Sequence, residues 1–502
     1  MAVNSGWQPP SQAGRFFATL AAIVIVAWGY MTIPSGCETE GAARSRSSLP
    51  GSPLEKNSTG STAATTSASV GVAKDFVEKP KTPPPLERPL PPTDQPNIRV
   101  RVAAVRDEPV QLTHPSGWLW LKGENAQAGR TFRAPIAVYP VVDGWRIVEA
   151  FGTTQAVSFR LKEIGSLHAK APQNSSGAIQ FNGNMYLGNA TMVRRADINE
   201  NASDLVFTVP LEEYLPGVLA KELFKGWQAN TYQAQAIAAR SYAACEMEWW
   251  RNRRHYDVVA GQASQAWVGA TSDAKSLDAV ANTRGQYLVF DGRVVPTYYS
   301  SCCGGLPSSA VDSIRDGTWT QIAPLAITEK GRRTMCCEKA PVAKWQASFS
   351  ISETVDRMNE WSKQAGRKDL GPINGMKSFV VGEKNSVGRS ITFLITDRNG
   401  KRFTWDASDF RVAMNASANK SSDSLKSSAL EPRIGNGRII LDGRGYGHGA
   451  GMCQYGAEFM AKSGKSPWAI LERYYPGATV VTMPETSSAS ATTSALVSSP
   501  KP

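Results

Sequence analysis

Apolar and polar residues change their spacing several times along this chain, and the first change marks off an N-terminal part without a core pattern. Residues 16–33 carry no charge and follow Arg15, which suits a membrane anchor or the apolar centre of an export signal. Residues 38–95 are rich in Ser, Thr, Pro and Ala and cannot bury a core. The pattern predicts an anchor or cleaved signal at 1–37, with lipid attachment at Cys37 as a third alternative, and a disordered spacer at 38–96.

The spacing then becomes that of short β-strands. Residues 98–102 alternate with period two, and further apolar runs separated by Gly, Pro and Asp turns lie at 118–121, 136–138 and 145–148. We therefore expect a β-rich region at 97–208. More strands are predicted at 286–290, 293–295, 390–395, 402–405 and 439–441, with helical segments at 352–363, 408–412, 457–464 and 467–474. Residues 483–502 read as a disordered tail.

Two helices joined by a short turn are predicted within 209–250. Pro210 suits the first turn of a helix, and Pro216 with Gly217 predicts a kink or break there. Residues 228–250 contain no Pro or Gly, and small residues recur on one face at helical spacing. Helices packed on a β-rich body make the predicted fold class α+β.

Composition narrows the function classes. A chain of 502 residues suffices for two or three domains, and its net charge of +12 suits anionic surroundings such as a membrane surface or an acidic wall polymer. The basic residues are dispersed and no nucleic-acid-binding motif is present, so we expect no nucleic-acid partner. The four histidines form no HExxH motif, which excludes a zincin protease, and the lack of a GxSxG motif weakens a serine hydrolase.

Two charged residues of the helical segment are not explained by packing. Glu222 lies among apolar residues, where desolvation would raise its pKa and suit it to general acid catalysis. Arg240 lies among alanines. From these residues alone the commoner role of Glu222 is a helix cap or an ion pair, with Lys221, Lys225 or Arg240 as the partner.

A glycine-rich segment at 443–456 follows the predicted strand at 439–441 and carries His448 and Gln454. It is not a dinucleotide site, because too few residues follow it for a doubly wound sheet. We interpret it as backbone that passes close to another group. His448 taken alone is as often structural as functional.

Seven cysteines include two adjacent pairs, Cys302 with Cys303 and Cys336 with Cys337. In an exported protein such pairs predict one or two disulfides between them. A four-cysteine zinc site is the alternative, but adjacent cysteines lack the usual C-x₂-C spacing. We therefore predict no metal and no cofactor. Cys245 and Cys453 are either buried thiols or a third disulfide.

Four segments together resemble the SpoIID/LytB family, named for stage II sporulation protein D. They are PLEEYLPGVLAKE (210–222), QAQAIAARSYA (233–243), GRGYGHGAGMCQYGAEFMAKSG (443–464) and ILERYYPGA (470–478). The resemblance runs from about residue 98 to 482 and implies a SpoIID-like catalytic core at 209–482. Characterised members are peptidoglycan lytic transglycosylases, and others modify a cell-wall amidase. The catalytic acid of the family corresponds to Glu222.

The resemblance also implies roles for other residues. His448, Gln454 and Tyr455 would lie beside the acid as binding or supporting residues, and Arg240 would be a structural partner or a substrate contact. Residues 296–307 are similar to a family segment in which Ser300 and Ser301 would bind substrate, a simple hairpin turn being the alternative. Cys303 and Cys337 would form a disulfide. Ser264-Gln265 replaces the pair found near a reported metal site in some members, so no zinc site is carried over.

The resulting expectation is an exported cell-envelope enzyme that acts on peptidoglycan glycan strands. Glu222 would protonate the glycosidic oxygen and then deprotonate the 6-hydroxyl of muramic acid, closing a 1,6-anhydro ring. A non-catalytic wall-binding modifier of another hydrolase is the second hypothesis, and a structural envelope tether is the third. Expected partners are glycan strands, a membrane through the N-terminal segment, and other wall hydrolases.

Overall fold

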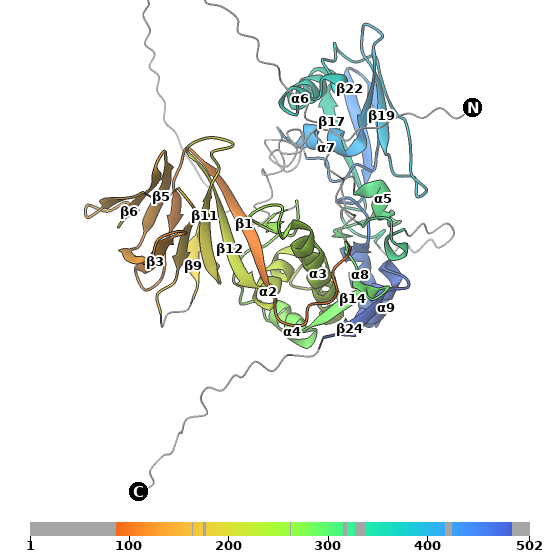
Figure 1. Cartoon of the computed structure of the whole chain (residues 1–502). Coiled ribbons are helices and arrows are strands. Elements are labelled where there is room, and N and C mark those ends of the chain that lie inside the picture. Colours follow the sequence, from red (N-terminus) through yellow and green to blue (C-terminus); the bar gives the residue numbers. More distant parts are fainter. Residues whose placement is uncertain are drawn as a thin grey trace, which may run out of the picture. The chain divides into compact units, whose positions relative to one another are not determined.

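The computed structural model describes residues 87–483 except 163, 174–176, 262, 315–318, 327–336 and 417–423. The predicted anchor, most of the spacer, Cys336 and the tail beyond 483 lie outside the described residues. Within the described part, no helix combines the length and apolar character needed to cross a membrane. The described residues form an α+β fold, as predicted (Figure 1).

The described part of residues 97–210 consists of strands joined by turns and loops and contains no helix. A seven-stranded sheet has the order β13-β1-β12-β11-β8-β3-β4, and a four-stranded sheet has the order β2-β5-β6-β7. The strands of the first sheet, in that order, are Val258–Val259, Asn97–Arg106, Ala202–Pro210, Asn189–Arg194, Leu167–Lys170, Trp118–Gly123 and Arg130–Arg133. Those of the second are Val110–Leu112, Ile136–Val141, Gly144–Glu149 and Val157–Leu161, and a separate hairpin joins β9 (Ile179–Phe181) to β10 (Asn184–Tyr186). The four strand predictions made for this region are confirmed.

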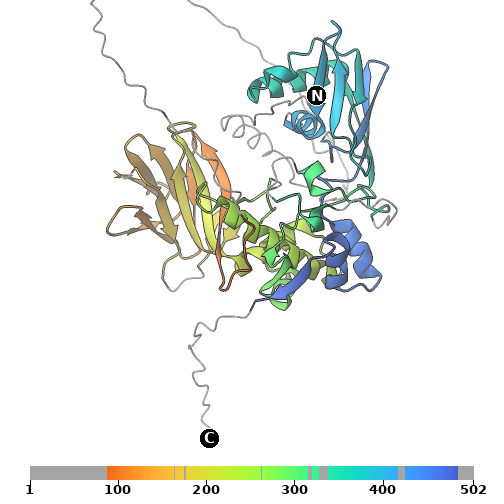
Figure 2. The same cartoon turned by 45° about the vertical axis from the view of Figure 1, so that its right-hand side comes forward.

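The register of β1 and β12 determines where the first central helix starts. These strands pair antiparallel with Ile98 opposite Val209, and β12 continues directly into α2 (Leu211–Glu222). Alternate residues of the strands share one hydrophobic core with α2 and with part of α3 (Ala229–Trp250). The predicted pair of helices is confirmed, and Figures 1 and 2 show both beside β1 and β12.

Of the kink or break predicted at Pro216, the break does not occur, because α2 continues through it to Glu222. An interior proline costs about 3 kcal/mol. Seven residues of α2 are buried. Burial of each large apolar side chain among them stabilises the fold by about 1.5–3 kcal/mol. Burial therefore outweighs the proline penalty. Pro210 is the residue before the helix rather than its first helical residue.

Gly217 provides a test of the close packing of α2. We expect Gly217→Ala to lower the free energy of unfolding by about 1–3 kcal/mol, as overpacked sites do. The added Cβ would lie 2.1 Å from the Gly269 carbonyl oxygen and 2.6 Å from Trp267 Nε1. Urea denaturation measures the change. Gly226→Ala is the matched control, since nothing lies within 4 Å of its added Cβ; equal effects of the two substitutions would contradict the packing argument.

The remaining elements around α3 come from distant parts of the chain. Parallel pairing of β16 (Tyr299–Ser300) with β23 (Met452–Cys453) brings the two predicted substrate segments together. β14 (Gln286–Phe290) pairs with β15 (Arg293–Val294), as predicted, and with β24 (Thr479–Thr482). The helices are α4 (Ala274–Asn282), α8 (Gln454–Lys462), α9 (Pro467–Tyr474) and the short α5 (Ala310–Ser313).

The end of the predicted spacer packs on this region. The guanidinium of Arg88 donates hydrogen bonds to the carbonyls of Phe290, Arg293 and Val294. The amide of Val294 in turn donates to the carbonyl of Pro89. The ordered part of the chain therefore starts at least as early as residue 87, ahead of the boundary at 96 that composition indicated.

Residues 344–444 contain a further hydrophobic core, separate from the one shared by β1, β12, α2 and α3. It lies between the sheets β17-β22-β21 and β18-β19-β20 and the helices α6 (Ile351–Gln364) and α7 (Ala407–Ala416). The strands are Lys344–Ser350, Arg438–Arg444 and Leu430–Gly435 in the first sheet, and Ser378–Val381, Thr392–Thr396 and Arg402–Asp406 in the second. The predicted helix at 352–363 is confirmed, and the short helical turn expected at 408–412 is a longer helix.

Candidate active site

Glu222 is the last residue of α2, and its carboxylate meets two segments from elsewhere in the chain. Oε1 accepts a hydrogen bond of 3.0 Å from the amide of Ala266, and Oε2 accepts one of 3.2 Å from Nε2 of Gln454. Gln454 is the first residue of α8 and belongs to the glycine-rich segment at 443–456. The helix and the glycine-rich segment, on which the enzymatic hypothesis depends, are therefore in direct contact.

Burial dominates the electrostatics of this carboxyl group. It raises the pKa of Glu222 above its ordinary value, while the hydrogen bonds from Ala266 and Gln454 and the charge of Lys221 only partly offset the effect. The group therefore keeps its proton to a higher pH than an exposed glutamate does. Arg240 does not pair with it, so the strong lowering that an adjacent guanidinium would cause is avoided.

Gln265 holds the loop that presents the Ala266 amide. Its Nε2 donates to the carbonyl of Ala239 at 3.2 Å and to the Tyr299 hydroxyl at 3.0 Å, and its Oε1 accepts from the Tyr214 hydroxyl at 3.2 Å. Sequence reasoning considered this glutamine only as part of a missing metal motif and overlooked its positioning role. The signal available in the sequence was a glutamine among small residues.

His448 supports the backbone of the glycine-rich segment. The amide of Ala450 donates to its Nδ1 at 3.1 Å, so Nε2 carries the proton and donates to the carbonyl of Tyr299 at 2.9 Å. Burial and the positive charge of Arg389 lower the pKa of His448 to about 4. The imidazole is thus neutral at pH 7, and both nitrogens are engaged with backbone, which favours the supporting role over substrate binding.

Ser300 and Ser301 lie next to the glycine-rich segment. Ser300 is buried in β16, and no hydrogen-bond partner for its hydroxyl is found within the described ranges. An added Cβ at Gly447 would lie 3.0 Å from the Ser300 Cβ, so the two backbones approach closely. The carbonyl of Ser301 accepts a hydrogen bond from the Tyr455 amide. Substrate binding by either serine stays a prediction.

Arg240 is fully buried and pairs with Glu212 rather than with Glu222. Its Nε and Nη2 each donate to one oxygen of Glu212 at 2.8 Å, and Nη1 donates to the carbonyl of Gln286 at 3.3 Å. These contacts join α3 to the start of α2 and to β14. Of the two roles considered for Arg240, they favour the structural partner over the substrate contact.

An aromatic cluster flanks the acid. The ring centroids of Phe224 and Trp227 are 5.2 Å apart, and that of Tyr455 lies 5.9 Å and 5.1 Å from them, respectively. Phe224 is 56% exposed although it is large and apolar. The exposed Phe224 ring beside a half-buried carboxyl group offers a surface on which a sugar ring can stack. Tyr455 was predicted to lie here, whereas Phe224 and Trp227 were overlooked.

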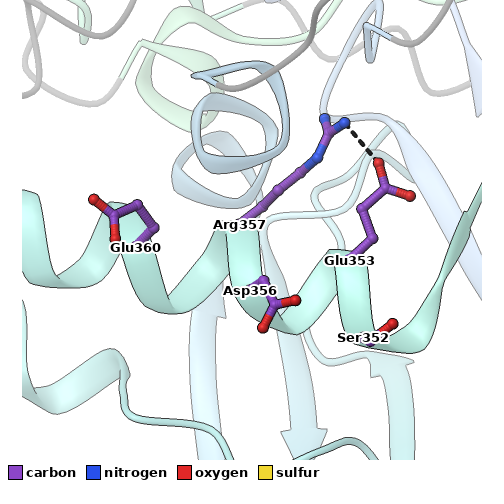
Figure 3. A pocket seen from close by; sticks show the side chains of 5 residues that line it. All are labelled: Ser352, Glu353, Asp356, Arg357 and Glu360. Atoms are coloured by element: carbon purple, nitrogen blue, oxygen red, sulfur yellow. Dashed lines mark hydrogen bonds and ion pairs between the residues drawn. The ribbon is translucent and has the colours of Figure 1, made fainter. Parts of the chain in front are cut away.

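A separate hollow of about 400 Å³ lies against α6. Figure 3 shows its lining residues, Ser352, Glu353, Asp356, Arg357 and Glu360, all from this one helix. Arg357 is paired with Glu353 at 2.7 Å. The hollow contains none of the predicted site residues and offers no convergence of segments, so we do not assign the active site to it.

Comparisons with known proteins agree with this geometry. The family model described as "Stage II sporulation protein" matches residues 199–290, which include Glu222, Arg240 and Gln265. An uncharacterized protein of Brachyspira hyodysenteriae is 27% identical over 334 residues, covering 65% of this chain and 80% of the relative. Stage II sporulation protein D of Bacillus subtilis is 27% identical over 295 residues, covering 56% and 77%.

A further Bacillus subtilis relative, named Amidase enhancer, is 25% identical over 355 residues. The match covers 64% of this chain but about half of that protein, 48% of its length. The family model over residues 199–290 and these relatives support the assignment of the chain to the SpoIID/LytB family.

Proposed function

We propose that this protein is an exported peptidoglycan lytic transglycosylase that cleaves the bond between N-acetylmuramic acid and N-acetylglucosamine. One observation carries the proposal: the Glu222 carboxyl group has a raised pKa and is held by Ala266 and Gln454 beside an aromatic cluster. Such a group keeps the proton needed for general acid catalysis to a higher pH than an exposed glutamate does. The net charge of +12 also suits an anionic cell-wall environment.

The reaction needs one protein carboxyl group used twice. Protonated Glu222 gives its proton to the glycosidic oxygen as the bond to C1 of muramic acid breaks through an oxocarbenium-like transition state. The carboxylate then accepts the proton of the muramic 6-hydroxyl, whose oxygen bonds to C1 and closes the 1,6-anhydro ring. No water is consumed. Because the nucleophile belongs to the substrate, the second carboxylate of most glycosidases is not required.

The neighbouring groups have separate tasks in this proposal. The Ala266 amide and Gln454 orient the carboxyl group and stabilise the anion that forms after proton donation. The exposed ring of Phe224, packed on Trp227 and Tyr455, stacks against a sugar ring. His448 and Gln265 hold the two loops in place.

The second candidate is a non-catalytic wall-binding protein that modulates another hydrolase, and the relative named Amidase enhancer favours it. Incubating the full chain with purified glycan strands, with and without stem peptides, separates the two. We expect anhydro-muramic ends, detected by mass spectrometry. Sedimentation of the protein with strands that stay intact would instead support the modulator. If the protein neither binds the strands nor releases product, the structural tether is the hypothesis that remains.

Removing Gln454 tests the electrostatic part of the proposal. Its amide donates to the carboxylate, stabilises the anion and lowers the pKa of Glu222, so Gln454→Ala is expected to raise that pKa. Since the acid must be protonated, activity falls as pH rises through its pKa. The descending limb of the pH–rate profile should therefore move to higher pH, with roughly a tenfold loss of maximal rate because the carboxyl group is less well oriented.

Gln364→Ala is the matched control for this experiment. Gln364 also donates to a glutamate, Glu360 at 2.6 Å, but on the remote helix α6. Its pH–rate profile should coincide with that of the wild type. A descending limb that stays in place in Gln454→Ala would argue against Glu222 as the titrating acid.

A further inference from the structure

Four cysteines from three segments converge beside the active site. Cys302 and Cys303 follow β16, Cys453 ends β23, and Cys337 precedes β17; all four are buried. The sulfurs of Cys302, Cys337 and Cys453 lie within 4.8 Å of one another. The sulfur of Cys303 lies 3.4 Å from that of Cys337. We call these residues the thiol cluster.

Sulfur spacing distinguishes a metal site from a disulfide. A tetrahedral zinc ion with bonds of about 2.3 Å separates its thiolate ligands by about 3.8 Å. A disulfide separates two sulfurs by about 2.05 Å and leaves any third sulfur unused. Three mutually close sulfurs with a fourth in contact match the metal geometry, whereas one Cys303–Cys337 disulfide would leave Cys302 and Cys453 as buried thiols.

Hydrogen-bond donors around the thiol cluster favour the negatively charged thiolate form of a cysteine. The amides of Cys303 and Gly456 each donate to the Cys453 sulfur at 3.3 Å, the second from the first turn of α8. Backbone amides at a helix N-terminus commonly stabilise a thiolate in this way.

Arg389 supplies an independent observation. It is buried, and its guanidinium donates to the carbonyl of Cys303 at 3.2 Å and to that of Gly447 at 3.1 Å. Among the residues that the structure describes, no carboxylate pairs with it. Buried charges are almost always compensated. A divalent ion held by four thiolates carries a net charge of −2 and would compensate this arginine.

We propose that Cys302, Cys303, Cys337 and Cys453 bind a structural zinc ion. Buried thiolates select soft or borderline metals, and zinc takes four of them in closed sites. The ion would tie the end of β16 to the segment before β17 and to the start of α8. The residue after Cys453 is Gln454, so the ion would also determine where that side chain meets Glu222. The zinc site stands whether or not the chain cleaves glycan strands.

This proposal departs from the sequence-based expectation of no metal and a Cys303–Cys337 disulfide. The disulfide expected from the sequence joined the two adjacent pairs, Cys302 with Cys303 and Cys336 with Cys337. Of these, Cys336 lies outside the described residues. Cys453 was not expected to join them, because only the pairing of β16 with β23 brings it there.

The test is the metal content and thiol reactivity of the full-length protein, purified with a reductant and without chelator. We expect about one zinc per chain by elemental analysis, and the visible and thiolate charge-transfer bands of tetrahedral cobalt after exchange. The clustered thiols should react with a thiol reagent only after a chelator is added. Zinc-free wild type whose thiols react at once, another metal in its place, or a Cys303–Cys337 disulfide found by peptide mass spectrometry would each overturn the proposal.

Single substitutions locate the ligands. Cys337→Ser and Cys453→Ser should each lower zinc occupancy at least tenfold at limiting zinc and remove the cobalt bands. Cys245→Ser is the matched control, because Cys245 is a buried cysteine on α3 whose thiol donates to the Val294 carbonyl. It should keep its zinc, and equal loss in all three variants would contradict the assignment. If a ligand variant does not fold, the thiol and metal measurements on the wild type still decide whether the thiol cluster binds zinc.

Discussion

Glu222→Gln is expected to reduce the release of anhydro-muropeptides from purified glycan strands by roughly 10²–10⁴-fold, the usual contribution of a general acid. The amide has nearly the shape of the carboxyl group and can still accept a hydrogen bond from Ala266. It cannot donate a proton to the glycosidic oxygen or take one from the 6-hydroxyl. Strand binding, measured by sedimentation, should be retained because no apolar or aromatic contact is removed.

Glu213→Gln is the matched control for this loss. Glu213 lies on the same helix but is exposed, so its variant should release product at the wild-type rate. Circular dichroism and thermal unfolding should be nearly unchanged in both proteins. Undiminished product from Glu222→Gln would remove this residue from the mechanism and the transglycosylase proposal with it.

Arg240→Met is expected to have the largest effect on stability, lowering the free energy of unfolding by about 3–5 kcal/mol. The exposed fractions of the paired side chains are 0% for Arg240 and 9% for Glu212. Removing the guanidinium leaves a nearly buried carboxylate without its ion-pair partner and frees the carbonyl of Gln286. Guanidinium chloride denaturation measures the loss.

Two further variants separate the structural role from substrate contact. Arg433→Met breaks an exposed pair with Asp442 and should cost no more than about 1 kcal/mol. Replacing both partners, as Arg240→Met with Glu212→Leu, should recover much of the lost stability, since a buried pair can be exchanged for apolar groups. If this double variant is stable but no longer binds glycan strands, Arg240 contacts substrate and the structural interpretation is wrong.

Local pattern predicted most elements of this fold. Helices α2 and α3 follow from apolar spacing, and the strands near residues 98, 118, 136 and 145 follow from alternation and turn residues. The break that the pattern allowed at Pro216 does not occur, because the local cost of an interior proline says nothing about how much of the helix is buried. It also placed the spacer boundary too late, because composition does not reveal that Arg88 binds three carbonyls of the β14–β15 hairpin.

By itself, the sequence determined that Glu222 and the glycine-rich segment were the candidates for chemistry, because a carboxylate in an apolar helix and a run of glycines are local features. Only the tertiary structure decided which atoms they meet: Ala266 and Gln454 at the acid, Glu212 rather than Glu222 at Arg240, and Cys453 in the thiol cluster. The physical reason is that these contacts join residues far apart in the chain. They depend on strand register and helix packing, which neither composition nor local periodicity encodes.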